Sequence, residues 1–221
     1  EGGWRSALST LGLTTAGWKA WPFAIIAPLL IHGVGIAVLV GFGLTAFVPP
    51  SAQGPVFFAV ADALIGFAVG SAFAMGEEVG WRGYMLPRLL SLGPVAAMLI
   101  VGLLQGIWHM PLLLTTELYH STGNPWIVAP MFLLTLTLAG IFFGFLRLWS
   151  GSVWPAAVAH GAVNTAWNLA TQMSGTRSPL VLEYIGGESG VIVITGLLLF
   201  DSLIIAYMLR TGLISHAAQR S

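Results

Sequence analysis

Hydrophobic residues form long runs along this chain, separated by short clusters of proline, glycine and asparagine. Six runs are long enough to cross a bilayer, which requires about 20 apolar residues in a helix. They cover approximately residues 21–48, 55–76, 93–115, 126–148, 151–172 and 190–210. The second run continues as a helix to about residue 90, and no alternation typical of strands is visible. The pattern predicts an all-α, polytopic transmembrane helical bundle with about six spans.

The positions of the basic residues predict the orientation of this bundle. Cytoplasmic loops of membrane proteins carry an excess of Lys and Arg. Alternating the six spans places seven of the eight basic residues on one side, and leaves Arg177 on the other with Glu117, Glu183 and Glu188. The seven are Arg5, Lys19, Arg82, Arg88, Arg147, Arg210 and Arg220. We therefore expect both termini to be cytoplasmic.

Composition narrows the class of protein further. The chain has 221 residues, of which 57% are hydrophobic and 7% charged, and this excludes a disordered protein. Its net charge is zero and it has no basic run, so no nucleic-acid partner is expected. The absence of cysteine excludes disulfides, zinc–thiolate sites and cysteine nucleophiles. We expect one membrane-embedded domain over residues 1–221, with 1–20 as a juxtamembrane segment. Because the chain begins with Glu1, we also expect further helices upstream.

Glu77-Glu78-Val79-Gly80-Trp81-Arg82 places two carboxylates and a guanidinium together in this nearly uncharged chain. A charge near the centre of a bilayer costs about 2.5–3.5 kcal/mol on insertion scales, so three of them call for a chemical explanation. Arg82 lies four residues after Glu78, the spacing at which the two side chains meet on one helix face. Glu77 points about 100° away and is left as a candidate general base. The alternative is a cluster that merely anchors the helix end.

Two histidines and an asparagine lie at a similar depth in neighbouring spans. His109 is late in the third run, and His160 and Asn164 share one face of the fifth. At 1.5 Å per residue from the cytoplasmic ends, Glu77 lies about 20 Å deep, His109 about 24 Å and His160 about 14 Å. These residues could therefore share one polar pocket. His32, Asp62 and Asp201 are expected to face the bundle interior and to form hydrogen bonds there.

The order and spacing of these residues resemble the three motifs of the CPBP family of intramembrane proteases, which includes the type II CAAX prenyl endopeptidases. The matching motifs are Glu77-Glu78-x-x-x-Arg82, His109 within Trp108-His109-x-Pro111, and His160-x-x-x-Asn164. The resemblance covers about residues 55–170, the predicted core of the protease domain. One position departs from the family, because Gln105 stands where the family usually has an aromatic residue.

The resemblance implies an intramembrane endopeptidase of the bacterial cytoplasmic membrane. Glu77 would activate a water for attack on a peptide carbonyl, and His109 would position that water or transfer protons. His160 and Asn164 would stabilise the oxyanion, while Glu78 and Arg82 would hold the site together. The substrate would be a membrane-associated, prenylated or leader peptide, and the oligomeric state is left open. The alternative is a non-proteolytic member that acts as a bacteriocin-immunity or regulatory membrane scaffold.

A metal is the open point of this implied mechanism. Glu77, His109 and His160 would make a plausible zinc set with water as the fourth ligand. The sequence has no HExxH helix, and these candidates are spread over three spans. We therefore expect catalysis without an obligatory metal, with Zn²⁺ as the alternative.

Overall fold

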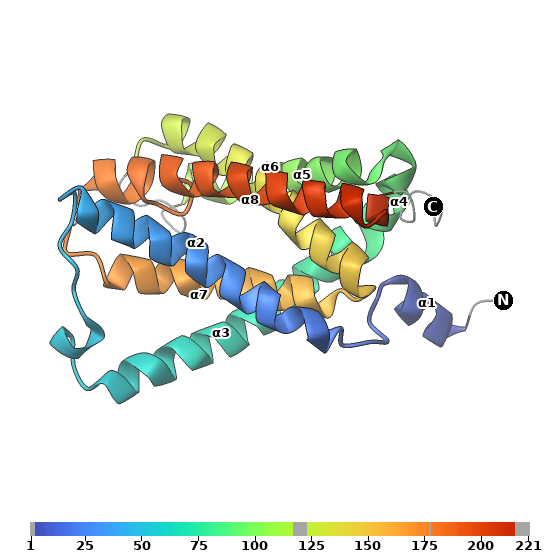
Figure 1. Ribbon diagram of the computed structural model, residues 1–221, viewed down its shortest axis with the longest axis horizontal. Helices are drawn as coiled ribbons and strands as arrows, with labels where there is room; N and C mark the ends of the chain where they lie inside the picture. The colour runs from blue at the N-terminus through green and yellow to red at the C-terminus, as the bar shows by residue number, and fades with distance from the viewer. Residues whose placement is uncertain (1–2, 117–122, 177, 215–221) are drawn as a thin grey trace.

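The computed structural model describes residues 3–116, 123–176 and 178–214, which fold into a bundle of helices (Figure 1). The α-helices are α1 Trp4–Thr10, α2 Trp21–Gly41, α3 Val56–Glu78, α4 Leu86–Leu89, α5 Pro94–Thr115, α6 Pro125–Ser150, α7 Trp154–Gln172 and α8 Val191–Arg210. Within those described ranges no β-strand occurs, and the predicted all-α class is confirmed. Glu117, Arg177 and Arg220 lie outside the described residues.

Five of the helices in the described ranges are long and apolar enough to cross a membrane. They span Trp18–Gly41, Val56–Leu92, Pro94–Thr115, Pro125–Ser150 and Val191–Arg210. The remaining predicted span is the helix α7, which falls outside this group. Its residues include His160, Asn164 and Asn168, which lower its hydropathy. The chain is therefore an integral multi-pass membrane protein, and α7 is its most polar long helix.

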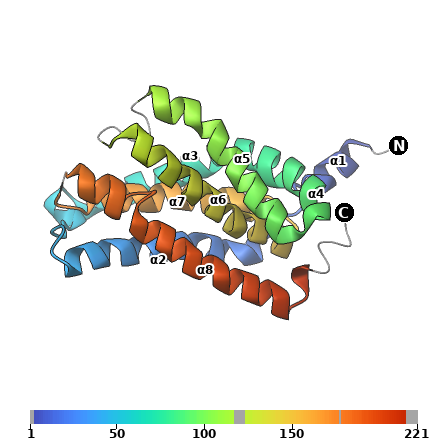
Figure 2. The same cartoon turned by 90° about the horizontal axis from the view of Figure 1, so that it is seen from above.

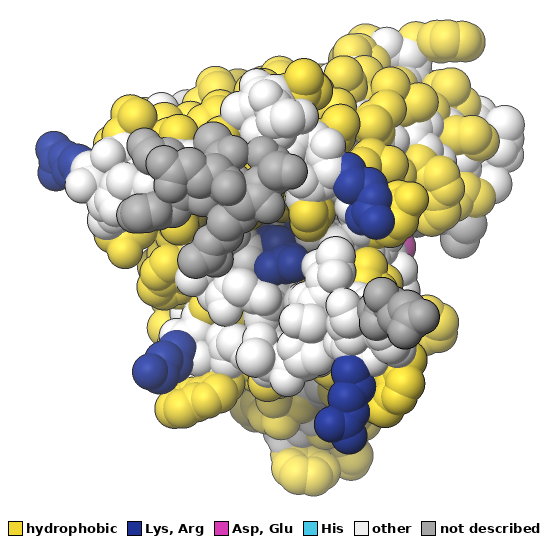
Figure 3. Space-filling model, turned by 90° about the vertical axis from the view of Figure 1, so that its right-hand side faces the viewer, with side chains coloured by type: hydrophobic (Ala, Val, Ile, Leu, Met, Phe, Trp, Pro, Cys, Tyr) yellow, Lys and Arg dark blue, Asp and Glu magenta, His cyan; other side chains and the backbone are white. Residues whose placement is uncertain are grey.

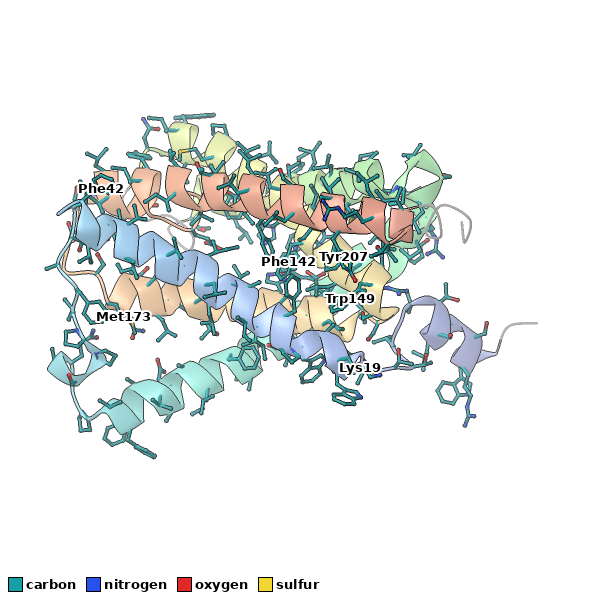
Figure 4. All side chains as sticks on the ribbon, in the orientation of Figure 1. Lys19, Phe42, Phe142, Trp149, Met173 and Tyr207 are labelled. Atoms are coloured by element: carbon teal, nitrogen blue, oxygen red, sulfur yellow. The ribbon has the colours of Figure 1, made fainter. Side chains whose placement is uncertain are left out.

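The first predicted span is shorter than the sequence pattern indicated. We expected a helix over 21–48, but α2 ends at Gly41 and is followed by Gly43 in the left-handed conformation at φ 68°. Residues beyond this turn run alongside the end of α7, where Val48 N donates to Met173 O and Gly175 N donates to Ala46 O, both at 2.9 Å. Figure 4 shows Phe42 and Met173 at this same end of the molecule. Hydrophobic residues alone did not reveal this change of conformation.

The helices form a central pair with neighbours on several sides. Figure 2 shows α6 and α7 in the middle, α5 on one side, and α2 and α8 on the other. α5 and α6 approach closely because both carry glycine at their crossing: a β-carbon on Gly102 would overlap the backbone of Leu136 and Thr137. The contact between α3 and α7 is equally close, since a β-carbon on Gly161 would lie 2.6 Å from Ser71 N. Small residues thus fix the distance between the helices that carry the site.

The second span changes its helical geometry where the charged residues lie. α3 continues without a break into a π-helical segment, Val79–Met85, and then into α4. The continuation to about residue 90 is confirmed. Segments of π-helix are rare and often occur at functional sites. Gly83 in this segment is tightly packed, because a β-carbon there would lie 2.9 Å from Leu11 O beyond the end of α1.

Basic side chains gather at one end of the bundle, which Figure 3 shows face-on. The described helix ends that meet there carry Arg5, Lys19, Arg88, Arg147 and Arg210. Glu183 and Glu188 lie before α8 begins, at the opposite end. This distribution agrees with the predicted orientation, and the cytoplasmic location of the basic end stays a prediction. Arg82 is the exception, because it is wholly buried.

Candidate active site

Glu78 and Arg82 form a buried ion pair. Arg82 Nη1 donates to Glu78 Oε1 at 2.9 Å, and both side chains are fully shielded from solvent. The predicted pairing of these two residues is confirmed. The guanidinium also lies over the ring of Phe143, with 4.8 Å from Cζ to the ring centroid. The pair ties the π-helical segment to α6 through this aromatic contact.

His160 contacts the same carboxylate from α7. Its Nδ1 lies 3.0 Å from Glu78 Oε1, and its ring stacks on Phe143 at a centroid distance of 5.6 Å. An ionised carboxylate can only accept a hydrogen bond, so Nδ1 carries the hydrogen. The sequence suggested only that His160 shares a pocket with Glu77. In the structure its direct partner is Glu78, because Glu78 points toward α7.

Glu77 faces away from the ion pair, as its position on the helix predicted, but it is not without a partner. Gln105 Nε2 on α5 donates to Glu77 Oε2 at 3.2 Å. The same amide uses its Oε1 to accept from Arg82 Nη1 at 2.5 Å. Glu77 is therefore outside the ion pair, as expected, but its carboxylate is bound by a neighbouring amide. A polar residue on the neighbouring helix reaches both charges, and spacing along one helix could not show this.

His109 lies one turn after Gln105 on α5 and is buried. Its Nδ1 donates to the backbone oxygen of Gln105 at 2.8 Å. Since a carbonyl oxygen only accepts, Nδ1 carries a hydrogen, and in the neutral form of the ring Nε2 is then the acceptor. The rings of Trp108 and Phe132 pack edge-on against the imidazole at 4.8 Å and 5.7 Å. The ring orientation of His109 is thus fixed from three directions.

A cavity of about 140 Å³ brings most of the predicted residues together. Four of the six candidates line it: Glu77, His109, His160 and Asn164. Glu78 and Arg82 do not line the cavity and lie behind its wall, in contact with His160 and Gln105. Apolar side chains close the other sides, among them Phe142, which Figure 4 shows between the helices. The arrangement is a small polar chamber within an apolar bundle.

Several residues of this chamber were not assigned to it from the sequence. His32, Gln105, Thr135 and Glu188 also line the cavity. The interior position of His32 was predicted, and its Nδ1 donates to Pro28 O at 3.0 Å. The sequence offered one indication of a special role for Gln105, because this residue departs from the family motif. The sequence offered no such indication for Thr135 and Glu188, because a threonine in a helix and a glutamate in a loop are common and do not point to a functional site.

Two other predicted interior residues differ from expectation. Asp62 is exposed and lies near the start of α3. Asp201 is buried on α8 as predicted, but neither carboxyl oxygen has a hydrogen-bond partner among the described residues. Neither residue lines the cavity. The site is therefore built without them.

The side chains do not form a ready metal site. Among the described residues, no group of three or more His, Asp or Glu side chains is placed so that it could hold a metal ion. Glu77 Oε2 and the Nδ1 atoms of His109 and His160 already take part in hydrogen bonds with protein groups. Because the described side chains form no such group of three, the zinc set does not fit this arrangement, and the chemistry is developed below from the side chains themselves.

Comparison with known proteins agrees with the motifs. A family model described as Rce1-like, type II CAAX prenyl endopeptidase, matches residues 58–166. This segment is just under half of the chain, runs from α3 into α7, and contains all six candidate residues. The match confirms the resemblance inferred from the sequence. No curated protein sequence matches the chain.

Proposed function

Because the segment 58–166 belongs to the Rce1-like family of type II CAAX prenyl endopeptidases, we propose that the protein is an intramembrane endopeptidase that uses a water activated by Glu77. This is a family of proteases, so the protein is a peptidase of the membrane and its substrate is a peptide or protein. The observation that carries the finer proposal is the cavity, which brings together the four predicted residues Glu77, His109, His160 and Asn164.

In the proposed reaction, Glu77 Oε1 takes a proton from a water in the cavity. The oxygen of that water forms a bond to the peptide carbonyl carbon, and the carbonyl oxygen becomes an oxyanion. When the C–N bond breaks, Glu77 returns the proton to the leaving nitrogen. A positioned general base contributes about 10²–10⁴-fold to such a reaction.

His109 is suited to orient the water. With its hydrogen on Nδ1 and used by the Gln105 carbonyl, the neutral ring presents an acceptor at Nε2. A water that donates one hydrogen to His109 and the other to Glu77 has its lone pairs directed away from both residues. This supports the role of His109 in positioning the nucleophile.

Asn164 and His160 are suited to stabilise the oxyanion to different degrees. The amide of Asn164 can donate at any pH, whereas His160 has already used Nδ1–H on Glu78. His160 can donate from Nε2 only when both ring nitrogens carry hydrogen. We therefore propose Asn164 as the principal donor, with His160 contributing as an imidazolium supported by the adjacent Glu78.

The substrate is proposed to be a membrane-associated peptide, either lipidated or a leader peptide. The cavity lies among helices that are apolar enough to cross a membrane, which favours a substrate that is itself held at the bilayer. The bacterial cytoplasmic membrane is the proposed location.

Comparing the peptides that accumulate in cells tests this function. Cells that carry Glu77→Gln in place of the wild type should accumulate uncut substrate, while cells that carry Asp62→Asn should not. Asp62 lies on the same helix, is exposed and does not line the cavity, so it controls for loss of a carboxylate. Unchanged peptide pools in Glu77→Gln cells, together with a retained cellular phenotype, would instead indicate a non-proteolytic scaffold.

A further inference from the structure

Gln105 occupies the centre of the site, at the position of the second motif where the family usually has an aromatic residue. Its side chain is 1% exposed, and it lies on α5 one turn before His109. Its amide contacts Arg82 on one side and Glu77 on the other, at 2.5 Å and 3.2 Å. Its backbone oxygen accepts from His109. Gln105 thus contacts the buried Arg82, the proposed base Glu77 and the proposed water-positioning residue His109.

The chemistry of the two partners fixes the orientation of this amide. A guanidinium can only donate and an ionised carboxylate can only accept. The carbonyl oxygen of Gln105 must therefore face Arg82 and its NH₂ group must face Glu77. A side chain that only donates or only accepts could satisfy one of these partners but not both.

The amide is also the connection between the ion pair and the base. No direct hydrogen bond joins Arg82 to Glu77 within the described residues, where Arg82 donates to Glu78 and Gln105 instead. The side-chain hydrogen bond that Glu77 makes in this part of the chain is the one from Gln105. With Oε2 occupied, the carboxylate is held with Oε1 available to the cavity.

We propose that Gln105 is a positioning residue that holds the Glu77 carboxylate in the orientation needed to activate water. The proposal rests on the proposed role of Glu77 as the base. Gln105 does not touch the substrate in this account, because it acts through Glu77. A purely structural Gln105 would serve only to supply an acceptor to the buried Arg82.

Gln105→Glu separates these two roles. A glutamate keeps an oxygen for Arg82 but loses the donor toward Glu77. A structural role predicts a stable and active variant. The positioning role predicts a folded variant with a low kcat, because the carboxylate of Glu77 is no longer held. Gln172→Glu, the same change on an exposed residue of α7, is the matched control.

The experiment measures kcat, KM and the thermal unfolding temperature of the purified full-length protein in detergent, with a peptide substrate. Loss of a hydrogen bond to a charged group is worth about 1.4 kcal/mol or more, so kcat of Gln105→Glu should fall about tenfold or more while KM changes little. Gln105→Asn, which has the same groups but is too short to span both partners, should show the same loss. In a Glu77→Gln background, Gln105→Glu should have no further effect on the rate.

A kcat within twofold of wild type for either folded Gln105 variant, or a Gln105→Glu effect that persists unchanged without Glu77, would overturn the proposal. These results are distinct from failure of the proposed function. If Glu77→Gln is itself fully active, the base is wrongly assigned. If Glu77→Gln is inactive and Gln105→Glu is active, only the role of Gln105 is wrong.

Discussion

The Nδ1 atom of His160 lies 3.0 Å from Oε1 of Glu78, so that α7 is joined to the second span at the level of the cavity. The same oxygen accepts from Arg82. Glu78 is therefore the anchor of the site, and its neighbour Glu77 is the carboxylate that faces the cavity. Adjacent residues of one helix have separate tasks because their side chains point about 100° apart.

Arg82→Ala should lower the stability of the folded protein as well as its rate of peptide hydrolysis. The substitution leaves the Glu78 carboxylate buried with one cationic partner fewer, and breaking a buried pair in this way costs about 3–5 kcal/mol. We expect a clearly lower thermal unfolding temperature in detergent, measured beside Arg88→Ala. Arg88 is an exposed arginine in α4, the next short helix, and its loss should change little. Equal unfolding temperatures for the two variants would contradict the anchoring role of the ion pair.

Asn164→Ala should reduce turnover without unfolding the protein. Asn164 lines the cavity but is exposed, so its removal leaves no buried group unpaired. Losing one oxyanion donor typically lowers kcat by about 10²–10³-fold. The control is Asn168→Ala, one turn further along α7 and outside the cavity lining. If both variants retain the wild-type kcat, the oxyanion is stabilised elsewhere.

Removal of metal ions should not abolish activity. Within the part of the chain that the structure describes, no group of three or more His, Asp or Glu side chains is placed so that it could hold a metal ion. We expect purified protein to retain its rate after exhaustive chelation and to contain no stoichiometric zinc by elemental analysis. Loss of activity that only zinc restores would mean that the side chains rearrange around a metal, and the proposed mechanism would then be wrong.

The sequence predicted the bundle well because the bilayer imposes a strong and simple pattern. Runs of about 20 apolar residues identified five spans, and the spacing of Glu78 and Arg82 identified their ion pair. The pattern failed at 42–48, where a glycine in the left-handed region ends the helix within an apolar stretch. It also did not separate α7 from the other spans, although this helix carries His160 and the exposed Asn164 and Asn168 and is not among the five most apolar helices.

The sequence predicted which residues form the site but not which of them contact one another. Depth along each span brought Glu77, His109, His160 and Asn164 to one level, and the cavity contains all four. Their partners depend on the rotation of each helix about its axis, which depth does not determine. Hence the contact of His160 with Glu78, and the bridge that Gln105 makes, became visible only in the structure.

The rate of peptide hydrolysis by purified Glu77→Gln, measured beside wild type and Asp62→Asn, tests the central claim most directly. A glutamine has nearly the same shape and can still contact Gln105, but it cannot take a proton from water. The account predicts that kcat falls by about 10²-fold or more, while the variant stays folded and binds the peptide. A Glu77→Gln rate within twofold of wild type would contradict the assignment of Glu77 as the base.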